Sequence, residues 1–354
     1  MTKYNKERVI GLDIIRLGLV LLIYLFHSHM HYKCDYWKFN DFISMGAIAM
    51  TAFFMLSGYS LHIADGGKNL LDKDALKYFY AKRFWGIMPL YYFMGALYVI
   101  YLVCTGRETL LKEIALSPVE LLGLQSYFSS LFNFSHNGGT WFVSCLLGCY
   151  FIYPFLEKIC GFLGRNKKVC AIAVLSGILL IAPIVQHGFH LSSIYTNPFF
   201  RILEFIIGIL IAQLNEVKVR DWSLIKLARN KYFANFCFLL LLLGVSIAVK
   251  INIPMDYMLY SWIGLPCFIV LFFYWGGVHG SESKIMLYLS KISYAFFLMQ
   301  LFLWQITRKI FEFTGLPEIN ALKIFISFSV CIIGASALHN WIEEPIKRRF
   351  LQHK

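Results

Sequence analysis

The sequence predicts an all-α, polytopic integral membrane protein with about ten transmembrane helices. Hydrophobic residues make up 58% of the 354 residues and charged residues only 15%, whereas soluble chains average about 25% charged residues. The mean hydropathy is +0.62. About 20 apolar residues are needed to span a bilayer as a helix. Such runs, which we expect to form one domain over 1–354, lie near 9–29, 42–62, 85–104, 140–160, 169–186, 200–214, 232–249, 257–276, 291–307 and 322–342.

The distribution of basic residues predicts the topology. Cytoplasmic loops of membrane proteins carry an excess of Lys and Arg. Most of the 33 Lys and Arg residues fall on one side if both termini are cytoplasmic, including the groups at 68–83, 165–168 and 347–349. The net charge of +13 is therefore interpreted as loop bias, and no nucleic-acid partner is expected. We expect a multi-pass protein of the cell (cytoplasmic) membrane whose first span is an uncleaved signal-anchor.

The first predicted span contains ionisable side chains, which are costly inside a membrane and suggest function by default. Arg16 and His27 are eleven residues apart, which is about three helical turns, so they share one helix face and lie about 16 Å apart along the axis. Asp13 and His31 lie on the same face. This polar stripe must line a cavity or path enclosed by protein.

The histidines of this span also raise the question of a metal site. His29 points about 200° away from His27 and His31 on a helix, and no Cys or carboxylate partner is evident. Zinc needs three or four ligands, so no metal is expected. The alternative for His27 is a core histidine that packs helices, and the alternative for Arg16 is a structural ion pair with Asp13.

Several motifs, in order along the chain, resemble those of the integral-membrane acyltransferase 3 family, whose members O-acylate polysaccharides and other envelope molecules. The match runs roughly from residue 8 to residue 346. Its strongest pieces are Leu12-Asp13 with Arg16 and His27, the segment 53–59 (Phe-Phe-Met-Leu-Ser-Gly-Tyr) and the segment 82–91 (Lys-Arg-Phe-Trp-Gly-Ile-Met-Pro-Leu-Tyr). Weaker pieces are Trp141 with Tyr150 and Pro154, Arg201 with Phe205 and Gly208, Ser293-Tyr294, and Glu343-Glu344-Pro345.

The chain departs from the family pattern at three places. The basic motif usually carries a second Arg three residues after the first, where this chain has Gly86. Leu146 and Leu147 stand where glutamates are frequent, and Gln300 stands where the ninth span often has His. These differences suggest a short, stand-alone subgroup, and Gly86 puts the usual donor-binding arrangement in question.

The resemblance implies an acyl-coenzyme A donor, with acetyl as the expected group, that enters from the cytoplasm as a co-substrate. His27 is then the general base for an acceptor hydroxyl, because a neutral imidazole has a suitable pKa. Arg16, Lys82 and Arg83 are the expected contacts to the phosphates or amides of the donor. For Lys82 and Arg83 the alternative is a simple positive-inside bias.

Three further residues are expected on the acceptor side. Arg201 is assigned an acceptor or transition-state role, its alternative being a snorkelling anchor. Trp141 and His136 are expected near the sugar rings of the acceptor, and an aromatic belt explains Trp141 equally well.

The predicted function is a membrane O-acyltransferase that acylates a hydroxyl of a cell-envelope or exported polysaccharide or a lipid-linked sugar. The expected partners are this glycan and the lipid bilayer, and a homo-oligomer is compatible with the sequence. The alternative is a transporter or flippase of an envelope glycan, which also has buried charges and many spans.

Overall fold

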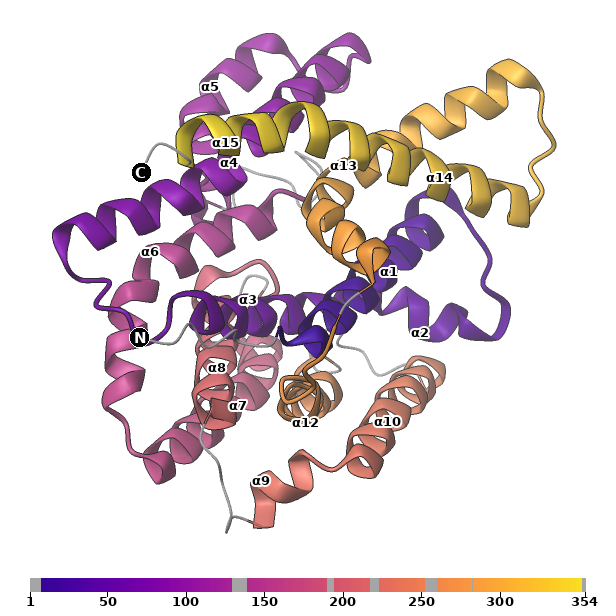
Figure 1. Ribbon diagram of the computed structural model, residues 1–354. Helices are drawn as coiled ribbons and strands as arrows, with labels where there is room; N and C mark the ends of the chain where they lie inside the picture. Colours follow the sequence, from indigo (N-terminus) through magenta and orange to yellow (C-terminus); the bar gives the residue numbers. More distant parts are fainter. Residues whose placement is uncertain are drawn as a thin grey trace.

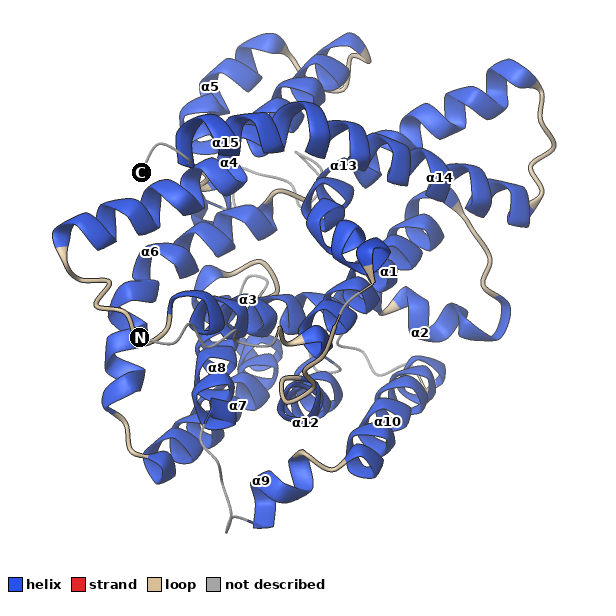
Figure 2. Ribbon diagram, in the orientation of Figure 1, coloured by secondary structure: helices blue, strands red, loops and turns tan. Residues whose placement is uncertain are grey.

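The computed structural model describes residues 8–128, 139–189, 194–216, 223–251, 260–281 and 283–351. Every regular element within these ranges is helical, and no strand occurs in them (Figure 2). The principal helices are α1 (Ile10–Tyr32), α2 (Asn40–Ser44), α3 (Ala49–Asp65), α4 (Lys73–Cys104), α5 (Leu110–Leu121), α6 (Trp141–Phe162), α7 (Arg165–Phe189), α8 (Pro198–Glu216), α9 (Ser223–Ala228), α10 (Lys231–Lys250), α12 (Leu265–Trp275), α13 (Lys284–Thr314), α14 (Asn320–Leu338) and α15 (Glu344–Leu351).

The predicted fold class is confirmed. In the described part of the chain, eight helical segments are long and apolar enough to cross a membrane: α1, α3 with the turn before it, α4, α6, α7, α8, α10, and α14 with its continuation to Phe350. The ninth predicted span corresponds to α13, which is bent by 67°, and the eighth to the shorter apolar helix Ser261–Trp275. The cytoplasmic location of the termini stays a prediction.

Helix starts are set by capping side chains. Asp72 accepts hydrogen bonds from the backbone N–H groups of Asp74 and Ala75 at the start of α4, and Ser283 accepts one from Met286 at the start of α13. Such caps satisfy N–H groups that have no partner within the helix. They explain why α4 and α13 begin before their apolar runs.

The centre of the molecule is the α3–α8 pair, which lies near the middle of Figure 1. Two glycines allow these helices to touch through their backbones. A Cβ added at Gly58 would lie 2.0 Å from the carbonyl oxygen of Phe205, and a Cβ at Gly208 would lie 2.0 Å from that of Met55. Small residues permit this close approach in membrane helix pairs.

Peripheral helices present apolar side chains outward. On α10, Phe236 is 58% exposed and Leu243 is 61% exposed, and on α7 Ile181 is 58% exposed. These exposed apolar side chains match the lipid contact expected of membrane helices.

The C-terminal segment crosses back over the bundle. After α14, a π-helical turn (η5, His339–Glu343) leads into α15, which packs against α4 (Figure 1). The rings of Trp85 on α4 and Phe350 on α15 are stacked, with centroids 3.9 Å apart. This contact brings residues from the end of the chain to one end of α4.

The glycine contact predicts that Gly208→Leu will strongly destabilise the protein. Any side chain at this position must push α8 away from α3, and overpacking typically costs about 1–3 kcal/mol. Gly177→Leu is the matched control, because a Cβ there meets no atom within 4 Å. Thermal unfolding of both variants in detergent is the measurement. Equal stability of the two variants would contradict the proposed packing constraint.

Candidate functional site

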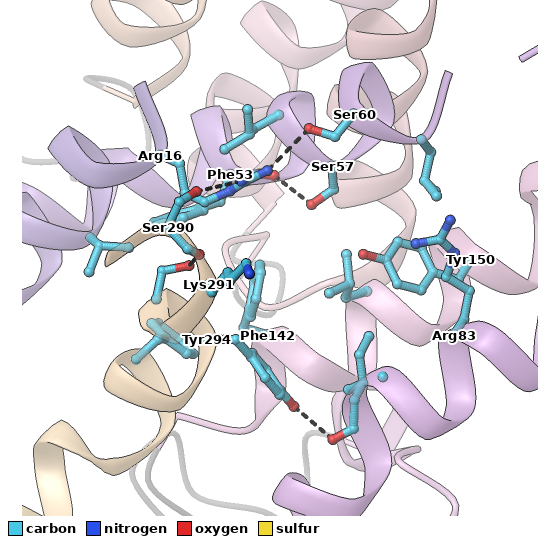
Figure 3. A pocket seen from close by; sticks show the side chains of 18 of the residues that line it. Arg16, Phe53, Ser57, Ser60, Arg83, Phe142, Tyr150, Ser290, Lys291 and Tyr294 are labelled. Atoms are coloured by element: carbon cyan, nitrogen blue, oxygen red, sulfur yellow. Dashed lines mark hydrogen bonds between the residues drawn. The ribbon is translucent and has the colours of Figure 1, made fainter. Parts of the chain in front are cut away.

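The candidate site is a cavity of about 330 Å³ enclosed by α1, α3, α4, α6, α13 and the C-terminal segment. Figure 3 shows polar and aromatic side chains around it. Four cationic residues line the cavity, namely Arg16, Arg83, Lys291 and Lys347, and its one acidic lining residue is Glu343. Cationic side chains therefore outnumber carboxylates in the lining.

Arg16 is held in place by hydrogen bonds to three helices. Its Nη1 donates to Asp13 Oδ1 and to Ser290 Oγ, both at 2.9 Å, and its Nη2 lies 3.5 Å from Ser60 Oγ (Figure 3). Asp13 is only 3% exposed and also accepts from Arg8 Nε at 3.1 Å. The structure thus contains the Arg16–Asp13 pair and also places Arg16 in the cavity wall.

Arg83 occupies the opposite part of the wall, beside Tyr150 (Figure 3). Its Nη2 donates to Asp65 Oδ2 at 2.5 Å, and its guanidinium carbon lies 5.7 Å from the centroid of the Tyr150 ring. Lys82 Nζ lies 4.0 Å from Asp65 Oδ1, and Lys82 does not line the cavity. The structure therefore places Arg83 in the cavity wall and Lys82 outside it, although the sequence predicts the same role for both residues.

In the C-terminal segment, the side chains of His339, Glu343 and Lys347 form one polar network. His339 Nδ1 lies 2.8 Å from Glu343 Oε2, and Lys347 Nζ donates to Glu343 Oε1. Glu343 is 5% exposed and His339 is 4% exposed. One turn of π-helix, a feature frequent at functional sites, carries His339 and Glu343.

Tyrosine and serine side chains complete the wall. Tyr294 donates from its hydroxyl to the backbone carbonyl of Ile87 at 3.2 Å, and Ser57 donates to the carbonyl of Phe53 at 2.8 Å. These bonds satisfy the polar groups without a ligand and fix the side chains at the cavity surface. The Tyr294 bond thereby joins α13 to α4, and the Ser57 bond stays within α3.

His27 lies outside this cavity wall, farther along α1 than Arg16. Its ring is stacked on His31, with centroids 5.4 Å apart, and contacts Phe26. Its Nδ1 is buried and has no hydrogen-bond partner among the described residues. His29 turns away and lies 2.9 Å from the carbonyl oxygen of Cys34 through Nδ1. The residue that orients His27 is therefore not identified among the described side chains.

Arg201 is fully buried at the start of α8. Its Nη1 donates to Glu204 Oε2 at 2.7 Å, and its Nε donates to the carbonyl of Tyr195 at 2.8 Å. Thr51 Oγ1 lies 3.4 Å from Nη1. The structure places Arg201 in a closed internal network with 0% side-chain exposure, rather than in the wall of the cavity.

Aromatic rings surround the Arg201 guanidinium. Its carbon lies 4.8 Å from the centroid of Tyr195, 5.4 Å from that of Phe54 and 5.7 Å from that of Trp141. Burial raises the pKa of the Tyr195 phenol above its ordinary value, so the ring stays neutral and presents its π face to the cation. Trp141 therefore packs on Arg201 and Tyr195, and His136 lies outside the described residues.

A second buried polar cluster lies outside the cavity. His62 Nδ1 lies 2.8 Å from Glu157 Oε1, and its Nε2 lies 3.1 Å from Glu216 Oε2. Tyr153 and Gln213 donate further hydrogen bonds to Glu157. The carboxylates bind opposite edges of one imidazole, which ties α3, α6 and α8 together. No group of three or more His, Cys, Asp or Glu side chains within the described ranges is arranged to hold a metal ion.

Of the predicted site residues, the structure brings Arg16 and Arg83 together in one cavity. Sequence reasoning missed Ser60, Lys291 and Lys347. The sequence places Lys347 only in the basic group at 347–349. Lys347 lies four residues after Glu343, and this spacing indicates that the two side chains can form an ion pair on a helix.

The Arg201 network predicts that Arg201→Met will destabilise the protein by about 3–5 kcal/mol, because Glu204 is left as a buried charge without its partner. The double variant Arg201→Met/Glu204→Leu should recover most of this loss. Arg348→Met is a control, since Arg348 pairs with Glu344 at 3.4 Å on the surface and such pairs contribute about 0–1 kcal/mol. Thermal unfolding is the measurement, and a single variant as stable as wild type would contradict the prediction.

Comparisons with known proteins identify the chain by family. Comparison with curated proteins and with solved structures returned no match. Residues 9–340 match the sequence model of a family described as an acyltransferase domain. The match covers nearly the whole chain, including the residues that line the cavity up to Phe297. The chain therefore belongs to the acyltransferase 3 family and is a multi-pass membrane acyltransferase.

Proposed function

We propose that this acyltransferase is an O-acetyltransferase that uses acetyl-coenzyme A from the cytoplasm and acylates a hydroxyl of a cell-envelope or exported glycan. The observation that carries the proposal is the positively lined cavity between α1, α4 and α13. Coenzyme A bears a ribose phosphate and a diphosphate, so its nucleotide end is a polyanion. Arg and Lys side chains bind such groups through charge-assisted hydrogen bonds.

The charges of the cavity favour a polyanionic ligand. Its lining holds the cations Arg16, Arg83, Lys291 and Lys347 against the single carboxylate Glu343. The partly apolar lining of the cavity strengthens such interactions relative to open water. A neutral glycan has no need of this charge, so the cavity is better suited to the donor than to the acceptor.

His27 is the proposed general base, at a distance from the cations. The last α1 residue in the cavity wall is Val20, and the seven further residues to His27 correspond to about 10 Å of helix. The nucleotide would bind at the cations while the thioester, at the far end of the pantetheine arm, extends toward His27. The imidazole would take the proton of the acceptor hydroxyl as the oxygen attacks the thioester carbonyl. It would return this proton to the sulfur of coenzyme A as the C–S bond breaks, so that the ester forms and the free thiol leaves.

Transfer by wild-type protein is the first test of the function. Purified protein in lipid nanodiscs should transfer label from [acetyl-¹⁴C]coenzyme A to the envelope glycan of its host, and deletion of the gene should remove O-acetyl groups from that glycan. Unchanged glycan acetylation together with glycan movement across vesicles would instead support a transporter.

His27→Ala should leave a folded protein that has lost transfer. No described residue is hydrogen-bonded to His27 Nδ1. The substitution therefore leaves no former partner of this atom without a hydrogen bond. Removal of a general base lowers rates by about 10²–10⁴. His279→Ala is the control, since His279 is an exposed residue whose ring bonds the backbone of Gly277. A purified His27→Ala protein with wild-type kcat would refute the catalytic assignment.

The structure also predicts different effects at Lys82 and Arg83. Arg83→Ala should raise the KM for acetyl-coenzyme A about tenfold with a smaller effect on kcat, because contacts far from the reacting carbon bind ground state and transition state alike. Lys82→Ala should change KM little, since Lys82 does not line the cavity. Asp65 retains Lys68 at 2.7 Å in both variants. Equal effects of the two substitutions would show that the cavity does not bind the donor.

A further inference from the structure

We propose that Lys347, on the C-terminal helix α15, binds a phosphate group of the acyl donor, and that the absence of a side chain at Gly86 makes room for it. The proposal rests on the proposed function, because it assumes that the cavity holds coenzyme A. It assigns to the last helix of the chain a direct role in donor binding.

Lys347 is placed at the cavity surface by contacts on one side. Its side chain is 31% exposed and lines the cavity. Its Nζ donates to Glu343, and His339 holds the other oxygen of that carboxylate at 2.8 Å. This sequence of contacts orients the ammonium group, while its remaining N–H groups are available to a ligand.

Gly86 carries no long side chain that would fill the space beside α4 where Lys347 lies. Both residues line the cavity. Among the described residues, and apart from the nearby backbone of α4 itself, a Cβ at Gly86 would have only Lys347 Cε within 4 Å, at 3.8 Å. This is an ordinary van der Waals distance, so a methyl group would fit and only a longer side chain would compete with Lys347 for the space. Gly86 lies one helical turn after Arg83, so the two positions are neighbours on the same face of α4. The stem of Lys347 therefore runs over bare backbone and brings a second cation to the face of α4 that carries Arg83.

The helix that carries Lys347 is anchored on α4. Phe350, three residues after Lys347, stacks on Trp85 with the ring planes 3° apart. Trp85 immediately precedes Gly86. Lys347 is thus fixed by Glu343 one turn before it and by Phe350 one turn after it. A cation held in this way loses little side-chain entropy when a phosphate binds.

The pair with Glu343 alone does not explain this geometry. An i, i+4 ion pair on a helix surface contributes about 0.3–0.5 kcal/mol and needs no cavity. Here Glu343 is 5% exposed and shared with His339, and Lys347 faces the same cavity as Arg16, Arg83 and Lys291. The convergence of four cations from four helices indicates recognition of an anion.

Ligand binding to the full-length protein in nanodiscs tests the proposal. Binding of coenzyme A, dephospho-coenzyme A and pantetheine is measured by isothermal titration calorimetry for wild type, Lys347→Ala, Lys347→Arg and Arg348→Ala. Lys347→Ala should weaken coenzyme A binding about tenfold, the loss expected for one charge-assisted hydrogen bond. Binding of pantetheine, which lacks the nucleotide phosphates, should not change. Dephospho-coenzyme A, which lacks the ribose phosphate, tells which phosphate is bound. If Lys347→Ala binds this ligand as tightly as wild type does, Lys347 contacts the ribose phosphate. If Lys347→Ala also binds this ligand more weakly than wild type does, Lys347 contacts the diphosphate.

The controls separate a phosphate contact from a structural effect. Arg348→Ala removes the same charge from the same helix outside the cavity and should bind like wild type, and Lys347→Arg should stay within threefold of wild type. Equal weakening of coenzyme A and pantetheine, or none, in Lys347→Ala would overturn the role of Lys347. Lys347→Arg binding as weakly as Lys347→Ala would also overturn it.

A second substitution tests the role of Gly86. In the Lys347→Ala background, Gly86→Arg places a cation in the vacated space and should restore most of the affinity for coenzyme A. A double variant that binds no better than Lys347→Ala would refute the assignment of Gly86. If wild type itself binds neither coenzyme A nor acetyl-coenzyme A, the proposed function fails, whereas wild-type binding that is unaffected by Lys347→Ala refutes the further inference alone.

Discussion

The buried carboxylate of Asp13 is the constraint on which the cavity depends. It is 3% exposed on a membrane-spanning helix, where an unpaired carboxylate is very costly. Three donors compensate it: Arg8 at 3.1 Å, Arg16 at 2.9 Å and Ser290 at 2.5 Å. Because Ser290 belongs to α13, satisfying Asp13 requires α1 and α13 to stay side by side. The same network directs the Arg16 guanidinium into the space between them.

This arrangement recurs at the other cations of the cavity. Asp65 holds Arg83 and Glu343 holds Lys347, and Asp13 and Asp65 themselves stay out of the cavity wall. Asp13 and Asp65 thus fix Arg16 and Arg83 from behind the wall, whereas Glu343 fixes Lys347 from within it. Buried ion pairs add little net stability because desolvation offsets their attraction. Their value here is preorganisation, since a site that is already oriented needs no rearrangement when charge arrives.

Hydrophobic runs sufficed to predict the fold, because in lipid each span must satisfy its own backbone hydrogen bonds as a helix. The position of Arg16 on a polar stripe also predicted a residue of the cavity wall. Lys82 and Arg83, however, are adjacent and point about 100° apart on a helix, and only tertiary packing decides which of them faces the cavity. The spacing of Lys347 from Glu343 indicates only that the two can pair. The position of Lys347 at the cavity and the enclosure of Arg201 depend on contacts between distant helices, which the spacing of residues in one sequence does not show.

The separation between the cations and His27 constrains any mechanism that uses both. The apolar end of the cavity is lined by Phe53, Phe142 and Phe297, whose ring centroids lie 5.2 to 6.5 Å from one another. A bulky, charged nucleotide is a poor fit for such a wall, and a narrow, uncharged arm is a better one. Coenzyme A divides its chemistry in the same way, with phosphates at one end and the thioester at the other. Under the proposed function, the cations therefore bind the nucleotide of the donor, and the aromatic rings line the part of the cavity that the acyl-bearing arm would occupy.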